Sequence, residues 1–311
     1  MTLTAVQLFS PPSEAQLLQF VFSGLTQGAV LALVALGFSM IYASMKLLNF
    51  AQGHYVVLGG LVTWWSTERL HIPIAVAVLL AGLVVAAVAV ATRQFLLRYA
   101  RNQSHLNAGM ITLGTGLLID AVILLQIGSD PVYVRSFLGD QPVRLLDATF
   151  ARQGVWVIAM AALVMILLRV FYARTLIGQA MRACSMNAEA ASLMGVNVGL
   201  MIALSWGLSG FIGGLGGATV APLVGAGYGQ GLFFALKGFT AATVGGLGSQ
   251  NGAIVGGLVV GLLSALITGF ADSQAADLVT FAILLILLVV RPRGLLGQIE
   301  VGVTAYEPLV T

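Results

Sequence analysis

Long apolar stretches alternate with short polar connections along the 311 residues of the chain. A helix that crosses a membrane needs about 20 mostly apolar residues. Seven stretches fit or approach that length: Leu17–Tyr42, Pro73–Ala91, Ala108–Ile127, Val155–Phe171, Val198–Leu223, Gly252–Phe270 and Asp277–Val290. The pattern predicts an all-α, polytopic transmembrane helix bundle that forms a single domain over residues 1–311.

Two further apolar segments, Tyr55–Trp65 and Gly231–Gly248, are shorter or are interrupted by Gly and small polar residues. Backbone breaks inside a bilayer persist only where protein or a water-filled cavity satisfies the freed backbone groups. We therefore expect these two segments to be broken or re-entrant helices near a solute pathway. With them, the bundle has about 8–9 membrane segments.

Composition excludes a water-soluble globule. The chain is 59% hydrophobic and only 8% charged, against about 25% charged residues in soluble domains. The net charge of +3 does not indicate nucleic-acid binding, because the basic residues form no dense patch. The single Cys184 has no partner for an intrachain disulfide, and we expect a small buried side chain there.

Basic residues indicate the orientation, because they concentrate on the cytoplasmic side of membrane proteins. If the N-terminus is outside and nine segments cross, the inner side carries Lys46, Arg93, Arg98, Arg101, Arg169, Arg174, Arg182, Arg291 and Arg293. The outer side then carries Arg69, Arg135, Arg144 and Arg152. The inner side is the more basic one, so this orientation, with the C-terminus in the cytoplasm, is predicted.

Glycine is abundant, with 38 residues in the chain. Small residues at helical spacing, such as Gly213 with Gly217 and Gly257 with Gly261, allow helix backbones to approach closely. A tightly packed bundle is predicted, and the sequence leaves open whether any single glycine does more than pack.

The connection Ala173–Val198 differs from the rest of the chain because it is amphipathic. Its polar residues alternate with alanine, leucine and methionine, which suits short helices at the membrane surface that offer an apolar face to a partner. A merely solvated loop is the alternative.

Within this connection, the run from Glu189, Ala190 and Ala191 to Gly195 resembles the E-A-A-x-x-x-G signature of bacterial ABC importer permeases. Three other runs resemble motifs of the branched-chain amino acid ABC transporter permease family. Leu48–Gly53 resembles L-N-F-A-H-G, with Gln52 where His is common; Gly245–Ala253 resembles G-G-x-G-S-x-x-G-A, with Asn251 where Pro is common; and Arg291–Gly297 resembles R-P-x-G-L-x-G.

The resemblance implies a permease subunit in the bacterial inner (plasma) membrane that forms the pathway for branched-chain or related amino acids. The implied partners are two ATP-binding subunits, a second and related permease subunit, and an extracytoplasmic solute-binding protein. It further implies that residues 173–198 couple the permease to the ATPases, through Gly178, Arg182, Asn187, Glu189, Ala190, Ala191 and Gly195. The departures at Gln52 and Asn251 bear on the solute more than on the transport role. Urea, short amides and other amino acids stay open as solutes, because related permeases serve them.

ATP and Mg are expected in the partner ATPase subunits, because this chain has no G-x-x-x-x-G-K-[ST] phosphate loop. No cofactor is expected in this chain. Metal binding is not expected either, since His54, His71 and His105 share no ligand spacing.

Six residues are candidates for lining the translocation path: Asn49, Gln52, His54, Tyr55, Thr112 and Asp120. Asp120 lies deep in a predicted span, where a charge costs about 2.5–3.5 kcal/mol or more. It can attract a solute ammonium group or hold a neighbouring helix. The residues from Asn49 to Tyr55 can line the path or cap the helix that follows them.

Lys237, in the second short segment, can meet an anionic group or extend its amine toward the outer membrane surface, and we favour the second. A membrane-embedded enzyme is not expected, because the predicted spans contain no convergent catalytic constellation. A channel or ion-coupled secondary transporter would also have broken helices. It would not need a docking connection such as Ala173–Val198, which is the feature that distinguishes the two classes.

Overall fold

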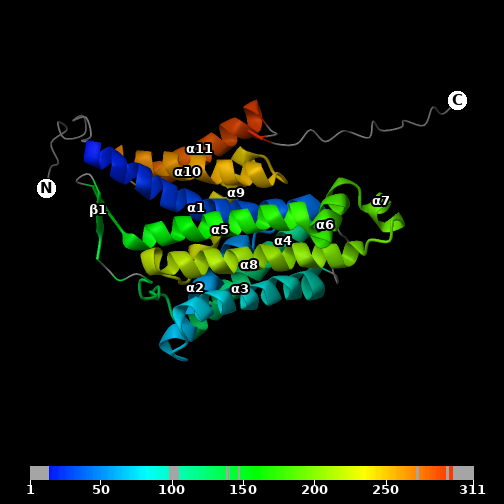
Figure 1. Cartoon of the computed structure of the whole chain (residues 1–311), viewed down its shortest axis with the longest axis horizontal. Helices are drawn as coiled ribbons and strands as arrows, with labels where there is room; N and C mark the ends of the chain where they lie inside the picture. Colours follow the sequence, from blue (N-terminus) through cyan, green and yellow to red (C-terminus); the bar gives the residue numbers. More distant parts are fainter. Residues whose placement is uncertain are drawn as a thin grey trace.

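The computed structural model describes residues 14–97, 105–137, 139, 141–145, 148–270, 273–291 and 294–296, and it forms a helix bundle with a small β-hairpin (Figure 1). Its elements are α1 (Glu14–Met45), α2 (Gln52–Glu68), α3 (Ile74–Ala91), the π-helix η2 (Thr92–Leu97), α4 (His105–Gln126), β1 (Val143–Leu145), β2 (Ala148–Phe150), α5 (Arg152–Arg174), α6 (Leu176–Met186), α7 (Ala188–Leu193), α8 (Val198–Val224), α9 (Gln230–Gly245), α10 (Gln250–Phe270) and α11 (Ser273–Val290). The predicted inner-side residues Arg98, Arg101 and Arg293 lie outside the described residues.

Among the described residues, six helices are long and apolar enough to cross a membrane: Glu14–Met45, Ile74–Phe95, Asn107–Gln126, Arg152–Arg174, Val198–Val224 and Gln250–Phe270. They correspond to six of the seven long stretches. The helices α2, α9 and α11 have 17, 16 and 18 residues and are not among them. The multi-pass bundle is confirmed, whereas the number of nine crossings stays a prediction.

The helix α2 runs without a break through Tyr55–Trp65, whereas the second short segment, Gly231–Gly248, is helical only as far as Gly245. Whether either segment is re-entrant stays a prediction. Glycines that suggested breaks serve instead as contact points. A Cβ atom on Gly59 of α2 would lie 2.6 Å from the Cα atom of Gly214 in α8. The interruption comes after α9, where Gly246 and Gly248 have φ angles of 110° and 82°.

The helix α1 is the central element of the bundle. In its most apolar window 78% of the residues are buried, against 28% for α5. It runs antiparallel to α10, and Cβ atoms on Gly257 and Gly261 would clash with the backbone of Ala32 and of Gly28. This confirms the close helix approach predicted for these two glycines.

The helix α2 packs on α8 in the same manner. A Cβ atom on Gly217 would clash with the carbonyl group of Val56, and one on Gly213 would lie 3.1 Å from the Cβ atom of Tyr55. Small residues on α8 therefore allow the backbone of α2 to lie in the interior of the bundle.

The chain after α11 returns to the end of α9. The backbone N–H of Leu295 donates to the carbonyl of Val244 over 2.8 Å, and that of Leu296 donates to the carbonyl of Gly245 over 2.9 Å. These bonds satisfy carbonyl groups that the last turn of a helix leaves without partners. Two sequence motifs that are far apart in the chain thus form one structural unit, of which Pro292, Arg293 and Gly297 lie outside the described residues.

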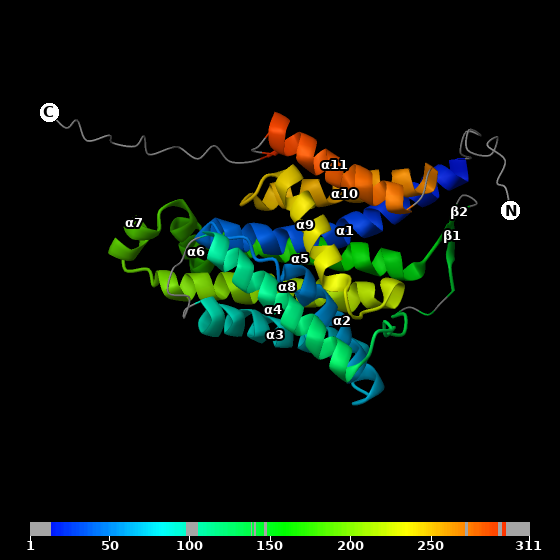
Figure 2. The same ribbon diagram turned by 180° about the vertical axis from the view of Figure 1, so that it is seen from behind.

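The short helices α6 and α7 lie at the opposite end of the bundle from the β1–β2 hairpin (Figures 1 and 2). The hairpin, which the sequence did not predict, pairs Val143 with Phe150 in an antiparallel register. At the hairpin end, an isolated bridge between Val132 and Ala226 joins two connections.

Candidate functional site

The six candidate path residues are all buried, with at most 6% of each residue exposed. Four of them lie at or just before the start of α2, which packs against α3, α8 and α9 and also contacts α1 and α4. The other two, Thr112 and Asp120, face this region from α4. The structure therefore brings together residues that the sequence could place only one by one.

His54 and Asp120 form the centre of this polar cluster. The Nε2 atom of His54 lies 3.2 Å from Oδ2 of Asp120, which links α2 to α4. Glycines make room for the imidazole ring on two sides. A Cβ atom on Gly116 of α4 would lie 2.5 Å from Cε1 of the ring, and one on Gly231 of α9 would lie 2.5 Å from Cγ.

Gln52 joins three helices. The hydroxyl of Ser209 on α8 donates to Oε1 of Gln52 over 2.7 Å, and Nε2 of Gln52 donates to the Ser209 carbonyl over 3.2 Å. The same hydroxyl oxygen lies 3.0 Å from the carbonyl oxygen of Gly37 on α1. The sequence did not indicate Ser209, which lies in a glycine-rich stretch without a recognised motif.

Thr112 and Asn49 shape the turn before α2. The Thr112 hydroxyl accepts from the backbone N–H of Phe50 over 3.2 Å and donates to the carbonyl of Gly109 over 2.9 Å. The side-chain oxygen of Asn49 accepts from the N–H of Ala51 over 3.1 Å. Both residues hold the chain as it enters α2, although neither side chain caps the helix, whose N-cap residue is Ala51.

One buried polar atom of the cluster lacks a partner. Among the described residues, Oδ1 of Asp120 has no hydrogen-bond partner. Such an atom costs about 1–3 kcal/mol when it is buried. This cost favours a site that meets water or solute in another conformation.

The predicted coupling connection is two short helices that are fixed to the bundle. The guanidinium group of Arg182 donates to the carbonyl of Tyr172 at the end of α5. The hydroxyl of Thr175 caps α6 by accepting from the N–H of Gly178 over 3.0 Å. A Cβ atom on Gly178 would lie 2.7 Å from the Cα atom of Tyr172, so α6 lies directly on the backbone of α5. Cys184 is buried as expected, and burial raises the pKa of its thiol.

The run from Glu189 to Gly195 is a capped helix. Asn187 caps α7 by accepting from the N–H of Ala190 over 2.9 Å. At the other end, the N–H of Val196 donates to the carbonyl of Ala191 over 3.1 Å and that of Gly195 to the carbonyl of Ser192 over 3.0 Å. This pair of bonds is a Schellman motif, which favours Gly at the left-handed position, and Gly195 has a φ of 85°.

The two helices present apolar side chains away from the bundle. Leu176, Met186, Leu193 and Met194 are 83–86% exposed, and we call these four residues the loop apolar surface. Beside it is a groove of about 450 Å³ lined by Ala173, Gln179, Arg182, Ala183 and Met186. Glu189 is exposed on α7. Exposed apolar side chains on a fixed base, with an exposed charge on the same segment, are suited to binding another protein.

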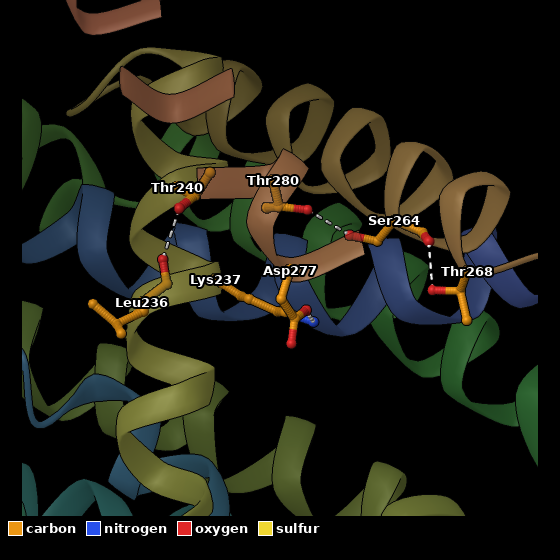
Figure 3. Close-up of polar contacts among 7 residues, drawn as sticks. All are labelled: Leu236, Lys237, Thr240, Ser264, Thr268, Asp277 and Thr280. Carbon is orange, nitrogen blue, oxygen red and sulfur yellow. Dashed lines mark hydrogen bonds and ion pairs between the residues drawn. The ribbon is translucent and has the colours of Figure 1, made fainter. Parts of the chain in front are cut away.

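Lys237 has the anionic partner that we considered the less favoured alternative. Its Nζ atom lies 2.6 Å from Oδ1 of Asp277, which joins α9 to α11 (Figure 3). The hydroxyl groups of Ser264 and Thr280 lie 3.0 Å apart and join α10 to the same helix. The sequence did not indicate these contacts, because polar residues on separate helices carry no mark of which partner they meet.

A family model described as "Branched-chain amino acid transport system / permease component" matches residues 20–288. The chain is 31% identical over 303 residues to the high-affinity branched-chain amino acid transport system permease protein LivH of Escherichia coli (strain K12), an alignment that covers 91% of this chain and 96% of that protein. It is 28% identical over 309 residues to the corresponding permease protein BraD of Pseudomonas aeruginosa, with coverage of 93% and 99%.

Proposed function

Because the chain belongs to the family of branched-chain amino acid transport permeases, we propose that it is the membrane-spanning permease subunit of an ATP-driven importer. Its solutes are branched-chain or related amino acids. It works with a second, related permease subunit, two ATP-binding subunits that hold ATP and Mg, and an extracytoplasmic solute-binding protein. Its relatives are transport permeases rather than enzymes, so ATP is hydrolysed in the partners.

The observation that carries this proposal is the loop apolar surface on the α6–α7 segment. Large side chains such as Leu193 and Met194 are exposed there although the segment itself is capped and anchored. A docking partner would bury them and gain roughly 25 cal/mol per Å² of apolar area. Because Arg182 and Gly178 fix α6 to the end of α5, movement of a docked ATPase would move the spans.

The proposed orientation places the α6–α7 segment and the C-terminus in the cytoplasm and the N-terminus outside, in the inner membrane of a bacterium. Packing supports a common side for the segment and the closing residues. Gly248, just after α9, packs against the ring of Tyr42 near the end of α1. Three residues further on, Met45 accepts a hydrogen bond from the indole of Trp206 on α8, which is the helix that follows the segment.

Co-purification from native membranes in mild detergent, followed by ATPase and uptake assays in proteoliposomes, tests the proposal. The variant Leu193→Glu with Met194→Glu alters only exposed side chains, and Tyr228→Glu, on an exposed residue of the connection before α9, is the matched control. We expect the double variant to lose the ATPase subunits and ATP-driven leucine uptake while the control keeps both.

Two outcomes would contradict the proposal. The first is a wild-type chain that purifies without ATPases and still transports without ATP, which would indicate a channel or secondary transporter. The second is transport of urea or acetamide in place of leucine, isoleucine and valine, which would leave the importer class intact and overturn the solute.

A further inference from the structure

The first turn of α9 faces the same imidazole that Asp120 binds. The helix starts after Gly229, which has a φ of 79°, and no side chain caps this end. The N-terminus of a helix carries a partial positive charge and exposes backbone N–H groups, which makes it a site for anions such as carboxylates. Gly231 in this turn packs directly on the ring of His54.

A negative group lies on the other side of the ring. Oδ2 of Asp120 contacts Nε2 of His54, whereas Oδ1 of Asp120 is buried without a partner among the described residues. The imidazole therefore fills the gap between a carboxylate and the positive end of a helix. These two ends match the two charges of an α-amino acid, an ammonium group and a carboxylate.

Apolar side chains lie one helical turn from each of the three groups. Val57 follows His54 on α2, Ile123 follows Asp120 on α4, and Phe234 follows Gly231 on α9. Val57 and Ile123 belong to one buried cluster, and Phe234 packs against it. Helices that are separated in sequence thus place an aliphatic environment beside the charged pair.

We propose that the solute is bound here as a zwitterion, in the place that the His54 ring fills in this structure, an inference that rests on the proposed transport function. The ammonium group of the solute binds Asp120, and its carboxylate binds the N–H groups of the first turn of α9. Its branched side chain packs against Val57, Ile123 and Phe234. His54 is the occupant of the empty site and leaves Asp120 when the solute arrives.

This role gives His54 and Asp120 effects of opposite sign, which a purely structural pair would not. Removal of the Asp120 charge takes away the partner of the ammonium group and weakens solute binding. Removal of the His54 ring takes away a group that competes with the solute for the same space, and so strengthens solute binding. If the pair only holds α4 against α2, both changes weaken binding together.

Saturation-transfer NMR detects weak binding and tests the proposal on the assembled permease and ATPase complex in lipid nanodiscs, without the solute-binding protein. The probes are leucine, isoamylamine, which lacks the carboxylate, and isocaproate, which lacks the ammonium group. We expect each analogue to bind about tenfold more weakly than leucine, the loss typical of one charge-assisted contact.

The variants are Asp120→Asn, His54→Ala and Phe234→Ala, with Leu117→Ala on the exposed face of α4 as the control. We expect Asp120→Asn to weaken leucine binding at least about tenfold and His54→Ala to strengthen it. Phe234→Ala leaves the charged pair in place and shifts preference from leucine toward alanine, so it tests the site even if Asp120→Asn fails to assemble.

The proposal is overturned if Asp120→Asn binds leucine as the wild type does, or if His54→Ala and Asp120→Asn weaken binding equally. ATP-driven leucine uptake by the wild-type complex with its binding protein distinguishes a failure of the proposed solute site from a failure of the proposed transport function. Normal uptake together with either of these results would refute the site alone, whereas a wild type that takes up no branched-chain amino acid would refute the transport function as well.

Discussion

The ion pair between Lys237 and Asp277 is the clearest place to test how α11 is held. The two charges lie 2.6 Å apart, and their side chains are 15% and 31% exposed. Lys237 also lies over the ring of Phe233, with its Nζ atom 4.1 Å from the ring centroid. We predict that Lys237→Met alone or Asp277→Asn alone destabilises the subunit more than both changes together.

The size of the stability loss depends on whether a variant leaves one charge of the pair without its partner. Breaking a fully buried ion pair on one side costs about 3–5 kcal/mol, because the remaining charge is desolvated without a partner. This pair is partly exposed, so about 1–3 kcal/mol is expected for each single variant. The double variant removes both charges and should lose about 1 kcal/mol or less, of which the contact of Lys237 with Phe233 is the main part.

The assay is thermal unfolding of the assembled complex in detergent, followed by loss of the folded peak in size-exclusion chromatography. The wild type, both single variants and the double variant form a double-mutant cycle, whose interaction term isolates the pair. The charge-exchanged variant Lys237→Asp with Asp277→Lys should recover part of the lost stability. Additive single effects, or no recovery on exchange, would refute the argument that the pair holds α11 on α9.

Three further predictions follow from packing and burial. Gly217→Ala places a methyl group against the α2 backbone and should destabilise the subunit by about 1–3 kcal/mol. Gly114→Ala, with open space around it, is the control and should be near neutral. Equal melting temperatures of the two variants would contradict this prediction. Because burial raises the pKa of Cys184, less thiolate is present at neutral pH than in a free cysteine. The rate of its labelling by a maleimide should therefore keep rising at pH values where the rate for a free thiol has levelled off. Labelling at the rate of free cysteine would contradict this prediction. Ser209→Ala leaves Oε1 of Gln52 without its partner, and a loss of about 1–3 kcal/mol should appear as a lower melting temperature of the complex, which an unchanged value would exclude.

The sequence predicted those features that depend on local pattern. Apolar length located the spans such as Val198–Leu223, and small-residue spacing located the close contacts of Gly257 and Gly261. The character of residues 173–198 predicted short helices with an exposed apolar face. It did not specify that Gly195 is the left-handed residue of a Schellman motif, although a glycine two residues after the last residue of a helix is compatible with that role.

Features that depend on which helices meet could not be predicted. His54 and Asp120 were both singled out, but their contact results from glycines on α4 and α9 that accept the imidazole ring. Lys237 was assigned to the membrane surface because Asp277 belongs to another helix, and no local pattern pairs them. The glycines of α2 were interpreted as breaks, because a contact glycine and a breaking glycine have the same appearance in a single sequence.

The two parts of the candidate site are connected by one continuous helix. Asn197 ends the α6–α7 segment and caps α8, accepting from the N–H of Leu200 over 3.0 Å. Ser209, which bonds Gln52 at the polar cluster, lies on α8 about 18 Å along its axis at 1.5 Å per residue. An α-helix resists compression. If the segment docks an ATPase as proposed, a displacement of the segment along α8 would therefore reach Gln52, and through α2 the neighbouring His54. In the proposed function, this single rigid helix would couple docking to the solute site.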